Sequence, residues 1–366
     1  MHRRTILIGG GSLVAVGAAA TWFEARAMGS ATAFDDRQRE LRAALSERPD
    51  ARELVRFATL APNSHNTQAW RFAVASGRIT VHPDLARRTP VVDPDDHHLF
   101  VSLGCAAENL VLAAAARGIA GDLVFDDRGE GSIGFAHHGS APRPTPLCDA
   151  IPRRQSTRAV YDGRTVSVAD LKTLTEAAAV PGVEVVLVTD RPQMDRIRDL
   201  VIAGNSAQLA DPAFMAELKS WLRFSPGRAL DTGDGLFGAA SGNPKLPEWL
   251  GQRAFDLFFT PKSENEKYAR QLDSSAGIAV FSGQRDDREH WVQVGRACQR
   301  FALQATVLGL KHAFINQPVE VPALRPELAA LVGLPGRRPD IVMRFGYGPT
   351  LPYSPRRLVA AVITGG

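Results

Sequence analysis

The spacing of apolar residues along the chain predicts alternating helices and short strands. Apolar positions three or four residues apart indicate helices, and short runs of β-branched residues indicate strands. The predicted helices span residues 35–60, 101–117, 168–179, 192–204, 212–222 and 289–308. The predicted strands span residues 69–75, 78–83, 184–188, 277–282 and 340–346. The first two strands read as a hairpin around Ser76-Gly77, and the whole pattern predicts an α+β protein.

Two stretches interrupt this pattern. Residues 128–150 are rich in Gly, Pro and His, and we expect them to be a linker. Residues 225–262 mix Gly and Pro with aromatic residues, which is too apolar for a plain linker. This second segment is either a mobile lid or a covering loop.

A weak internal repeat relates two of the predicted helices. Residues 104–119 align with residues 295–310 at an offset of 191 positions, and Gly104 then matches Gly295. The helix at 101–117 is nearly all apolar, which predicts a place in the core. The repeat indicates either a duplication or a chance match between two Ala-rich core helices.

Composition excludes several classes of protein. The chain has 366 residues, of which 45% are hydrophobic and 22% charged, with a net charge of +4. These values argue against disorder, collagen-like repeats, a polytopic membrane protein and nucleic-acid binding. Three cysteines, Cys105, Cys148 and Cys298, are too few for a disulfide framework. They show no metal-ligand spacing either, and we expect no metal site.

The N-terminus carries the pattern of an export signal. Arg3-Arg4 precede residues 6–20, which hold no charge, and Ala25-Arg26-Ala27 supplies a small-x-small cleavage site. The uncharged run of about 15 residues is shorter than the roughly 20 needed to span a bilayer. We therefore expect residues 1–27 to be a twin-arginine signal peptide. The mature protein would be periplasmic or otherwise extracytoplasmic, with no stable membrane span. The alternative is an uncleaved N-terminal membrane anchor.

Twin-arginine export carries proteins that have already folded. Proteins that load a cofactor in the cytoplasm use it disproportionately. The signal itself therefore favours a bound redox cofactor.

An alternating basic segment offers a phosphate site. Arg154, Ser156 and Arg158 would project to one face of an extended segment. Two guanidinium groups and a hydroxyl suit a phosphate monoester, because arginine presents paired donors to phosphate oxygens. The alternative is a solvated basic turn.

Two further polar segments complete the candidate site. The loop at 61–68 carries Asn63, Ser64, Asn66 and Gln68, whose neutral donors and acceptors suit a heteroaromatic ring. Its alternative role is simple turn chemistry. Near the C-terminus, Asn316-Gln317 follow a strand-like run, and Arg356-Arg357 form a second cationic pair. If this pair lies beside Arg154 and Arg158, together they surround a phosphate dianion. The chain has no G-x-G-x-x-G after a strand, no G-x-S-x-G and no H-E-x-x-H, which argues against Rossmann, hydrolase and metalloprotease functions.

Three motifs together resemble the nitroreductase superfamily of FMN enzymes. They are P-N-S-H-N-T-Q-A-W at 62–70, R-Q-S-T-R at 154–158, and G-Y-G followed by S-P-R-R at 346–357. The order of the first two is similar to that of the Acg-like branch, in which two nitroreductase-type halves are fused in one chain. The resemblance implies an α+β, three-layer, nitroreductase-like fold built as a single-chain pseudo-dimer. Its halves would span residues 35–145 and 150–366, with 225–262 inserted in the second.

The resemblance also assigns roles within the site. One complete FMN site per chain is implied, with a degenerate site on the opposite side. No catalytic side chain is implied, because the flavin carries the redox chemistry. The phosphate would be held by Arg154, Ser156, Arg158, Arg356 and Arg357. Asn63, Ser64, Asn66 and Gln68 would approach the isoalloxazine ring or ribityl chain, and Asn316 and Gln317 would lie near the flavin N5 edge.

The implied function is an FMN-dependent oxidoreductase that passes hydride or electrons through flavin to a small nitroaromatic or quinone-like acceptor. NAD(P)H or a redox partner would be the electron donor, and a monomer would suffice because both halves lie in one chain. If residues 225–262 fill the substrate space, the alternative is a protein that sequesters or stores FMN with little turnover. A third possibility is an α+β protein that binds no flavin.

Overall fold

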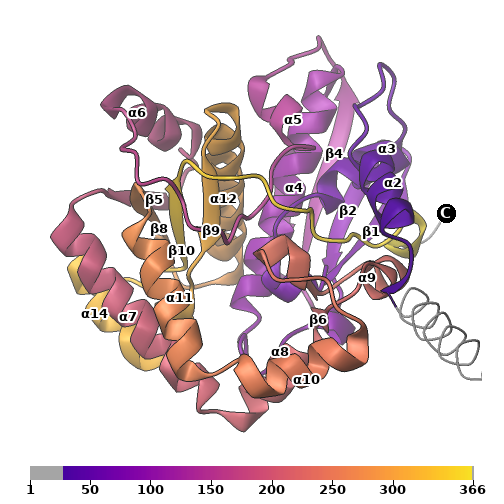
Figure 1. Cartoon of the computed structure of the whole chain (residues 1–366). Coiled ribbons are helices and arrows are strands. Elements are labelled where there is room, and N and C mark those ends of the chain that lie inside the picture. The colour runs from indigo at the N-terminus through magenta and orange to yellow at the C-terminus, as the bar shows by residue number, and fades with distance from the viewer. Residues whose placement is uncertain (1–27, 365–366) are drawn as a thin grey trace, which may run out of the picture.

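The computed structural model describes residues 28–364, so the expected export signal at 1–27 lies outside the described residues. The first half of the chain forms one mixed unit of helices and antiparallel strands (Figure 1). Its elements are α2 (Ala31–Leu41), α3 (Ala51–Thr59), β1 (Trp70–Ala75), β2 (Arg78–Pro83), α4 (His97–Ala116), β3 (Ile119–Asp126), β4 (Ser132–Gly139) and α5 (Pro146–Ala150).

The second half is longer and holds most of the helices. It begins with α6 (Val168–Ala177), β5 (Val183–Val188), α7 (Arg191–Leu209), α8 (Pro212–Ser220), β6 (Leu222–Arg223), α9 (Pro226–Thr232), β7 (Leu236–Phe237), α10 (Glu248–Phe258) and α11 (Pro261–Asp273). It ends with β8 (Gly277–Gly283), α12 (Arg288–Val307), β9 (Lys311–Phe314), α13 (Gln317–Glu320), α14 (Arg325–Leu331), β10 (Ile341–Gly346) and β11 (Ile363–Thr364).

The two halves share one topology. In the first half the strands β1, β2, β4 and β3 lie in that order, and in the second half β5, β8, β10 and β9 do the same. All neighbours within these two sets are antiparallel. Each set is preceded by a shorter helix, α3 or α6, and each has a long helix, α4 or α12, between its second and third strands along the chain. The observed fold is therefore α+β, as expected, and repeats one plan twice.

A large insertion distinguishes the halves. Strands β1 and β2 are joined by the two residues Ser76-Gly77, whereas β5 and β8 are joined by residues 189–276. Helices α7 to α11 all belong to this insertion, and most of its shorter elements lie below the two sheets in Figure 1. The apolar segment at 225–262 is therefore the middle of a longer inserted unit.

The long helices α4 and α12 cross at very close range between the sheets. A Cβ atom on Gly104 would lie 2.1 Å from the carbonyl oxygen of Val292, and one on Gly295 would lie 2.0 Å from that of Val101. The two contacts are equivalent under the 191-residue offset of the sequence repeat, because Gly104 corresponds to Gly295 and Val101 corresponds to Val292. Only glycine permits this approach at either position.

Two polar pairs further along α4 and α12 are also equivalent under the 191-residue offset. Glu108 accepts a hydrogen bond from Arg300 at 2.9 Å, and Gln299 donates to Asn109 at 2.6 Å. Glu108 corresponds to Gln299 and Asn109 to Arg300 at the same offset. The weak sequence repeat thus marks a local two-fold arrangement of α4 and α12.

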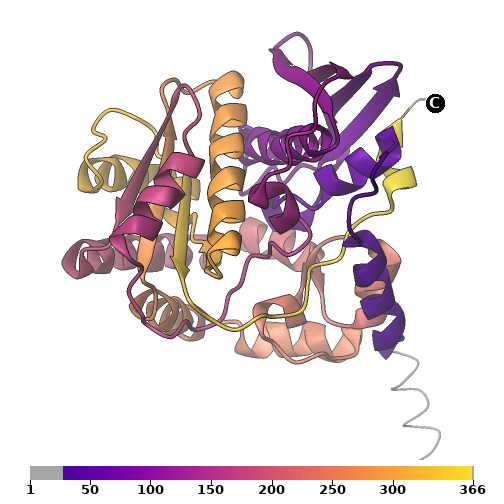
Figure 2. The same cartoon turned by 90° about the horizontal axis from the view of Figure 1, so that it is seen from above.

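The C-terminal tail ties the halves together. After β10 the chain leaves the second sheet, crosses the molecule and adds β11 in parallel to β1, with Ile363 opposite Phe72 (Figure 2). On the way, residues 352–354 and Arg356 reach the candidate site.

Two expectations about the first half were wrong. Residues 128–150 are not a linker, because they form β4 and α5, and both Ile133 and Phe135 are fully buried. The helix expected over 35–60 is two helices, because Asp50 accepts a hydrogen bond from the Glu53 backbone and starts α3 afresh. Strand pairing outweighed composition in the first case, and the cap at Asp50 outweighed the helical spacing in the second.

Among the described residues, α4 alone is long and apolar enough to cross a membrane, and 89% of its most apolar stretch is buried within the protein. It packs against α12 and the first sheet in the largest hydrophobic cluster, as its apolar sequence predicted.

Candidate functional site

Two adjoining cavities lie where the halves and the insertion meet. The larger has a volume of about 240 Å³ and the smaller about 50 Å³. They share the walls formed by Pro62, Asn63, Arg158, Leu236 and Phe314. A single elongated molecule could therefore occupy both.

The smaller cavity is strongly cationic. Four arginines line it, Arg42, Arg154, Arg158 and Arg356, and its lining contains no Asp or Glu. The Arg42 guanidinium also stacks 3.6 Å from the ring centre of Tyr353 in the same wall. Such a set of like charges without a carboxylate fits an anion with several oxygens.

Arg154 is the most deeply placed of these groups. It donates to the carbonyl oxygen of Leu60 at 3.0 Å, but its Nε and one terminal nitrogen are buried without a partner among the described residues. Burial lowers the pKa of Arg154 to about 10 and that of Arg42 to about 9. An anion here would restore the missing hydrogen bonds and offset the cost of burying the charges.

The alternation expected at 154–158 is present only in part. Thr157 is buried away from the cavity, where it donates to Gln155 at 3.1 Å and its backbone donates to the carbonyl oxygen of His312 at 2.8 Å. Arg154, Ser156 and Arg158 all line the smaller cavity, and Gln155 lines it too. The structure therefore brings together the three residues of the predicted phosphate segment.

Arg356 lies at the same cavity but is held by protein groups. Its guanidinium donates to the carbonyl oxygens of Thr59 and Ala61, at 2.7 and 3.1 Å, and to the side-chain oxygen of Asn66 at 2.8 Å. Burial and the neighbouring Arg42 and Arg154 lower its pKa well below the usual value. Arg356 thus places the C-terminal tail against the end of α3 and adds positive charge to the cavity.

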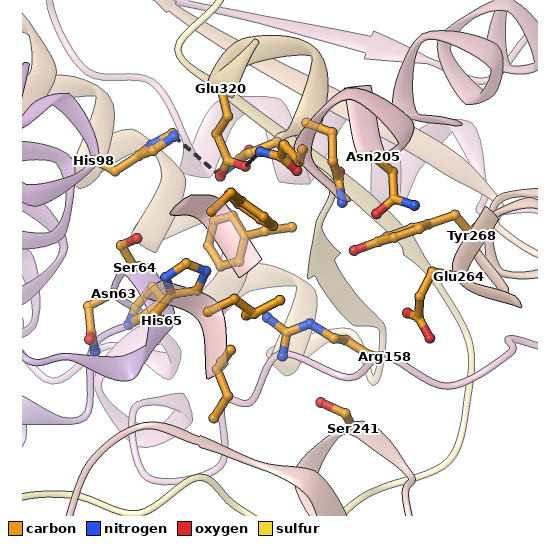
Figure 3. Close-up of a pocket in the computed structure, with 18 of the residues that line it drawn as sticks. Asn63, Ser64, His65, His98, Arg158, Asn205, Ser241, Glu264, Tyr268 and Glu320 are labelled. Atoms are coloured by element: carbon orange, nitrogen blue, oxygen red, sulfur yellow. Dashed lines mark hydrogen bonds and ion pairs between the residues drawn. The ribbon is translucent and has the colours of Figure 1, made fainter. Parts of the chain in front are cut away.

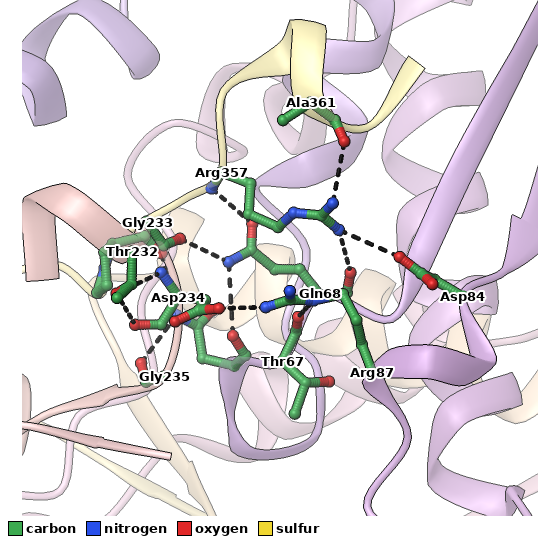
Figure 4. A network of polar contacts seen from close by, with 12 residues as sticks. Thr67, Gln68, Asp84, Arg87, Thr232, Gly233, Asp234, Gly235, Arg357 and Ala361 are labelled. Carbon is green, nitrogen blue, oxygen red and sulfur yellow. Dashed lines mark hydrogen bonds and ion pairs between the residues drawn. The ribbon is translucent and has the colours of Figure 1, made fainter. Parts of the chain in front are cut away.

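Gln68 and Arg357 line neither cavity, in contrast to their expected roles. The Gln68 side chain donates to Gly233 at 2.8 Å and accepts from the Arg357 backbone at 2.9 Å (Figure 4). The Arg357 guanidinium is taken up by Asp84 at 3.5 Å and by the carbonyl oxygen of Ala361 at 2.9 Å. These groups join the loop, the insertion and the tail instead of facing the site.

The loop at 61–68 adopts a demanding backbone. His65, Asn66 and Gln68 have φ angles of 43°, 54° and 54°, the left-handed region that favours glycine. The Asn66 side chain donates hydrogen bonds to the carbonyl oxygens of Gly235 and Pro355, at 2.9 and 3.0 Å, and these bonds offset the conformational cost. A strained backbone conformation persists where several contacts with the surrounding structure hold it in place. Such conformations cluster at binding sites.

Replacing Gln68 by alanine is expected to loosen this loop. The change removes two buried hydrogen bonds and should lower the free energy of unfolding by about 2 kcal/mol. It should also expose residues 233–235 to limited proteolysis. Gln252→Ala, on the exposed face of α10, is the matched control and should change neither property. Equal unfolding midpoints for the two variants would contradict the assignment.

The larger cavity joins polar loop residues to an apolar inserted wall (Figure 3). Asn63, Ser64, Asn316 and Gln317 all line it, as expected for residues that face a ring. Buried atoms without a partner among the described residues include His65 Nδ1 and Gln317 Oε1. The insertion supplies the apolar side: Leu209, Phe214, Leu218, Leu222, Leu236 and Phe259.

The structure adds two titratable groups to this cavity, His98 and Glu320. No sequence motif had identified either residue as part of the site. His98 lies at the start of α4, next to His97, and both imidazoles are buried. His98 Nε2 lies 3.5 Å from a Glu320 oxygen, and Gln208 donates to the other oxygen at 2.6 Å. Across residues 28–364 no group of three His, Cys, Asp or Glu side chains is placed to hold a metal ion.

The paired cavities therefore fit a ligand with an anionic end and a flat, partly apolar body. The anionic end would lie among Arg154, Ser156 and Arg158. The body would lie between the loop at 61–68 and the inserted wall, with Asn316 and Gln317 beside it.

The chain is similar in sequence to two Mycobacterium tuberculosis proteins that are named provisionally as NAD(P)H nitroreductases. Identity to Rv3131 is 28% over 86% of this chain and 92% of that protein, and identity to Acg is 24% over 84% and 93%. A solved nitroreductase with bound FMN from Bacteroides fragilis has a TM-score of 0.35 and 16% identity, covering 56% of this chain and 90% of that one. Residues 151–348, more than half of the chain, match the model of the nitroreductase family, and the chain therefore belongs to that family.

Proposed function

We propose that the protein is an FMN-dependent oxidoreductase with one cofactor site per chain. The observation that carries this proposal is the arginine-lined cavity that adjoins a larger, partly apolar cavity. FMN has this shape and charge, with a phosphate dianion at one end and an isoalloxazine ring at the other. Membership of the nitroreductase family supports the same cofactor.

The residues present fit FMN in their chemistry. The partnerless donors of Arg154, with Ser156 and Arg158, would hold the phosphate. Asn63 and Ser64 would lie along the ring or ribityl chain. Asn316 and Gln317 would adjoin the redox edge of the ring. When bound, FMN supplies the transfer of hydride, and the protein supplies position, charge and exclusion of water.

A nicotinamide donor is supported by the names of the two mycobacterial relatives, both described as NAD(P)H nitroreductases. The acceptor class follows from the walls of the larger cavity. Phe214, Leu218 and Phe259 favour a flat, apolar molecule such as a quinone or nitroaromatic compound.

Purification and assay test the proposal directly. The purified protein should be yellow, contain FMN and oxidise NADPH or NADH in the presence of a quinone or nitroaromatic acceptor. A colourless protein that takes up no added FMN would contradict it.

Storage of FMN without turnover remains a second candidate, because the insertion forms one side of the cavity. If this wall blocks acceptors, Phe259→Ala should raise turnover severalfold, since it removes a large ring without touching the contacts of residues 233–235. A loaded wild-type protein that turns over as fast as the variant would exclude blocking by Phe259. Trp249→Ala, on an exposed side chain of α10, is the control.

We also propose that the two halves arose as fused nitroreductase-type halves and that the second, symmetry-related site is degenerate. The matching strand orders and the offset contacts of α4 and α12 support fusion. At the 191-residue offset, Arg296 replaces Cys105 of the cavity wall and donates to Glu108 at 2.9 Å. A side chain this large, already ion-paired, would occupy the equivalent space.

Export remains a proposal that rests on residues 1–27. A periplasmic location would separate the enzyme from the cytoplasmic NAD(P)H pool, so a redox partner or quinol would replace the nicotinamide there. Mass spectrometry of the N-terminus from a periplasmic fraction should show cleavage after Ala27. An intact N-terminus in a membrane fraction would favour the anchor.

A further inference from the structure

A buried acid lies on one wall of the larger cavity. Glu320 ends α13 and lies between Gln208 of α7 and His98 of α4, at 2.6 and 3.5 Å (Figure 3). The carboxyl side chain keeps 18% of its surface accessible and lines the cavity. Nothing in the flavin site described above uses it.

Glu320 has no cationic partner among the residues that the structure describes. Burial lowers the pKa of His98 well below its usual value, so this imidazole is neutral. Lys267 of α11 is paired with Glu264 at 3.4 Å. Because burial dominates, the pKa of Glu320 is raised to about 7, and the Gln208 hydrogen bond opposes this only in part. The other titratable groups that line the cavity are His65, Cys105, Arg158 and Tyr268.

We propose that Glu320, held by Gln208 and His98, donates the proton that a quinone-like acceptor takes up when it is reduced in the larger cavity. This inference rests on the proposed function. It adds a proton donor to a site whose binding residues carry none. In Figure 3 the Glu320–His98 pair lies across the cavity from Arg158, so the acid faces the space that the phosphate end does not need.

The reaction balances with the groups named. The quinone accepts a hydride, which carries two electrons, from the reduced cofactor of the proposed function. The O–H bond of Glu320 breaks, its proton goes to a quinone oxygen, and the quinol leaves with two electrons and two protons gained. The Glu320 carboxylate then regains a proton from solvent.

Further titratable groups lie behind His98, on the side away from the cavity. The ring of His98 lies 4.7 Å from that of His97, and His97 Nε2 lies 2.8 Å from Asp340. The Nδ1 atoms of both imidazoles are buried without a partner among the described residues. Because no hydrogen bond joins the two rings, Glu320 regains its proton from solvent through the cavity that it lines.

The pH dependence follows from the protonated form being the donor. Below pH about 7 Glu320 holds its proton and quinone reduction is fast, and the rate should fall as the pH rises through about 7. General acid catalysis by one positioned side chain contributes about 10²–10⁴-fold. Loss of the acid should therefore slow the quinone step by at least about 10²-fold.

Stopped-flow half-reactions of the FMN-loaded holoenzyme test the inference. Glu320→Gln should stay yellow, be reduced by NADPH at the wild-type rate and be reoxidised by ferricyanide normally, because that acceptor takes up no proton. Its reoxidation by a benzoquinone should be slow and independent of pH. Glu266→Gln, an exposed carboxylate on α11, should match the wild type throughout.

Infrared titration of the apoprotein gives a readout that does not depend on activity. Burial also raises the pKa values of Asp93 and Asp340 to about 7. Glu320→Gln should therefore lose one of the carboxyl signals that ionise near pH 7 in the wild type and keep the others. Glu320→Asp keeps an acid and should retain pH-dependent quinone reduction at a reduced rate. Wild-type quinone reoxidation by Glu320→Gln would overturn the inference. Failure of Glu320→Gln to retain FMN would also overturn it, by making Glu320 part of the cofactor site, while a yellow wild type would leave the proposed function standing.

Discussion

Replacing both Arg154 and Arg158 by alanine is expected to give a folded protein that purifies without yellow colour. Both side chains line the smaller cavity, and Arg154 has two buried donor atoms that find no partner within residues 28–364. Hydrogen bonds to a charged group contribute about 1.5–3 kcal/mol each. Losing two such groups should weaken FMN binding by about 10²–10⁴-fold.

The fold should survive because the Arg154 side chain makes one hydrogen bond among the described residues, to Leu60, and removal of two like charges relieves their repulsion. Circular dichroism would check folding, and absorbance in the flavin bands would measure retained FMN. Arg153→Ala is the matched control, because Arg153 is exposed and lies outside the cavity. Full flavin content in the double variant would remove the phosphate assignment.

Replacing both Gly104 and Gly295 by alanine should be the most destabilising change in the core. Each new Cβ would lie about 2 Å from a backbone carbonyl oxygen of the opposite helix, so α4 and α12 would have to separate. Overpacking costs up to about 3 kcal/mol per site, and alanine returns about 0.5–1 kcal/mol of helix propensity. The net loss should be about 4 kcal/mol in the free energy of unfolding.

Chemical denaturation measures this loss, and flavin content should fall with it because α4 also lines the larger cavity. Gly139→Ala is the control, since a Cβ there would meet nothing within 4 Å. An unfolding midpoint equal to that of the wild type would show that the two helices tolerate separation and would contradict the close two-fold packing.

The hydrophobic pattern predicted those elements whose signals are local. The hairpin at Ser76-Gly77, the apolar core helix and the strand at 340–346 all followed from spacing and turn residues. Composition gave a wrong prediction where pairing with another strand determines the structure. β4 is rich in Gly and His, yet Ile133 and Phe135 alternate into the core against β2.

The phosphate segment could be predicted because alternation is a property of a short extended stretch. The spacing of Arg154, Ser156 and Arg158 was enough to group them, although Gln155 between them also lines the cavity. Gln68 and Arg357 could not be assigned in the same way. Their partners, Gly233 and Asp84, are distant in sequence, and only the folded chain brings them together.

The acid at Glu320 was beyond sequence reasoning for a related reason. Its raised pKa comes from burial between α4, α7 and α13, and no motif surrounds it. Likewise, the sequence identified the apolar segment at 225–262 but could not predict its role. The insertion forms one wall of the larger cavity, and Gly233 and Gly235 within it accept hydrogen bonds from the strained loop at 61–68.

Binding of FMN and of riboflavin to the apoprotein, compared by titration calorimetry, tests the central claim most directly. The two ligands share the ring and ribityl chain, and riboflavin lacks only the phosphate. A site that holds the phosphate among Arg154, Ser156 and Arg158 predicts one FMN per chain and riboflavin binding weaker by about 10²–10⁴-fold. Equal affinity for the two ligands, or two FMN molecules per chain, would contradict it.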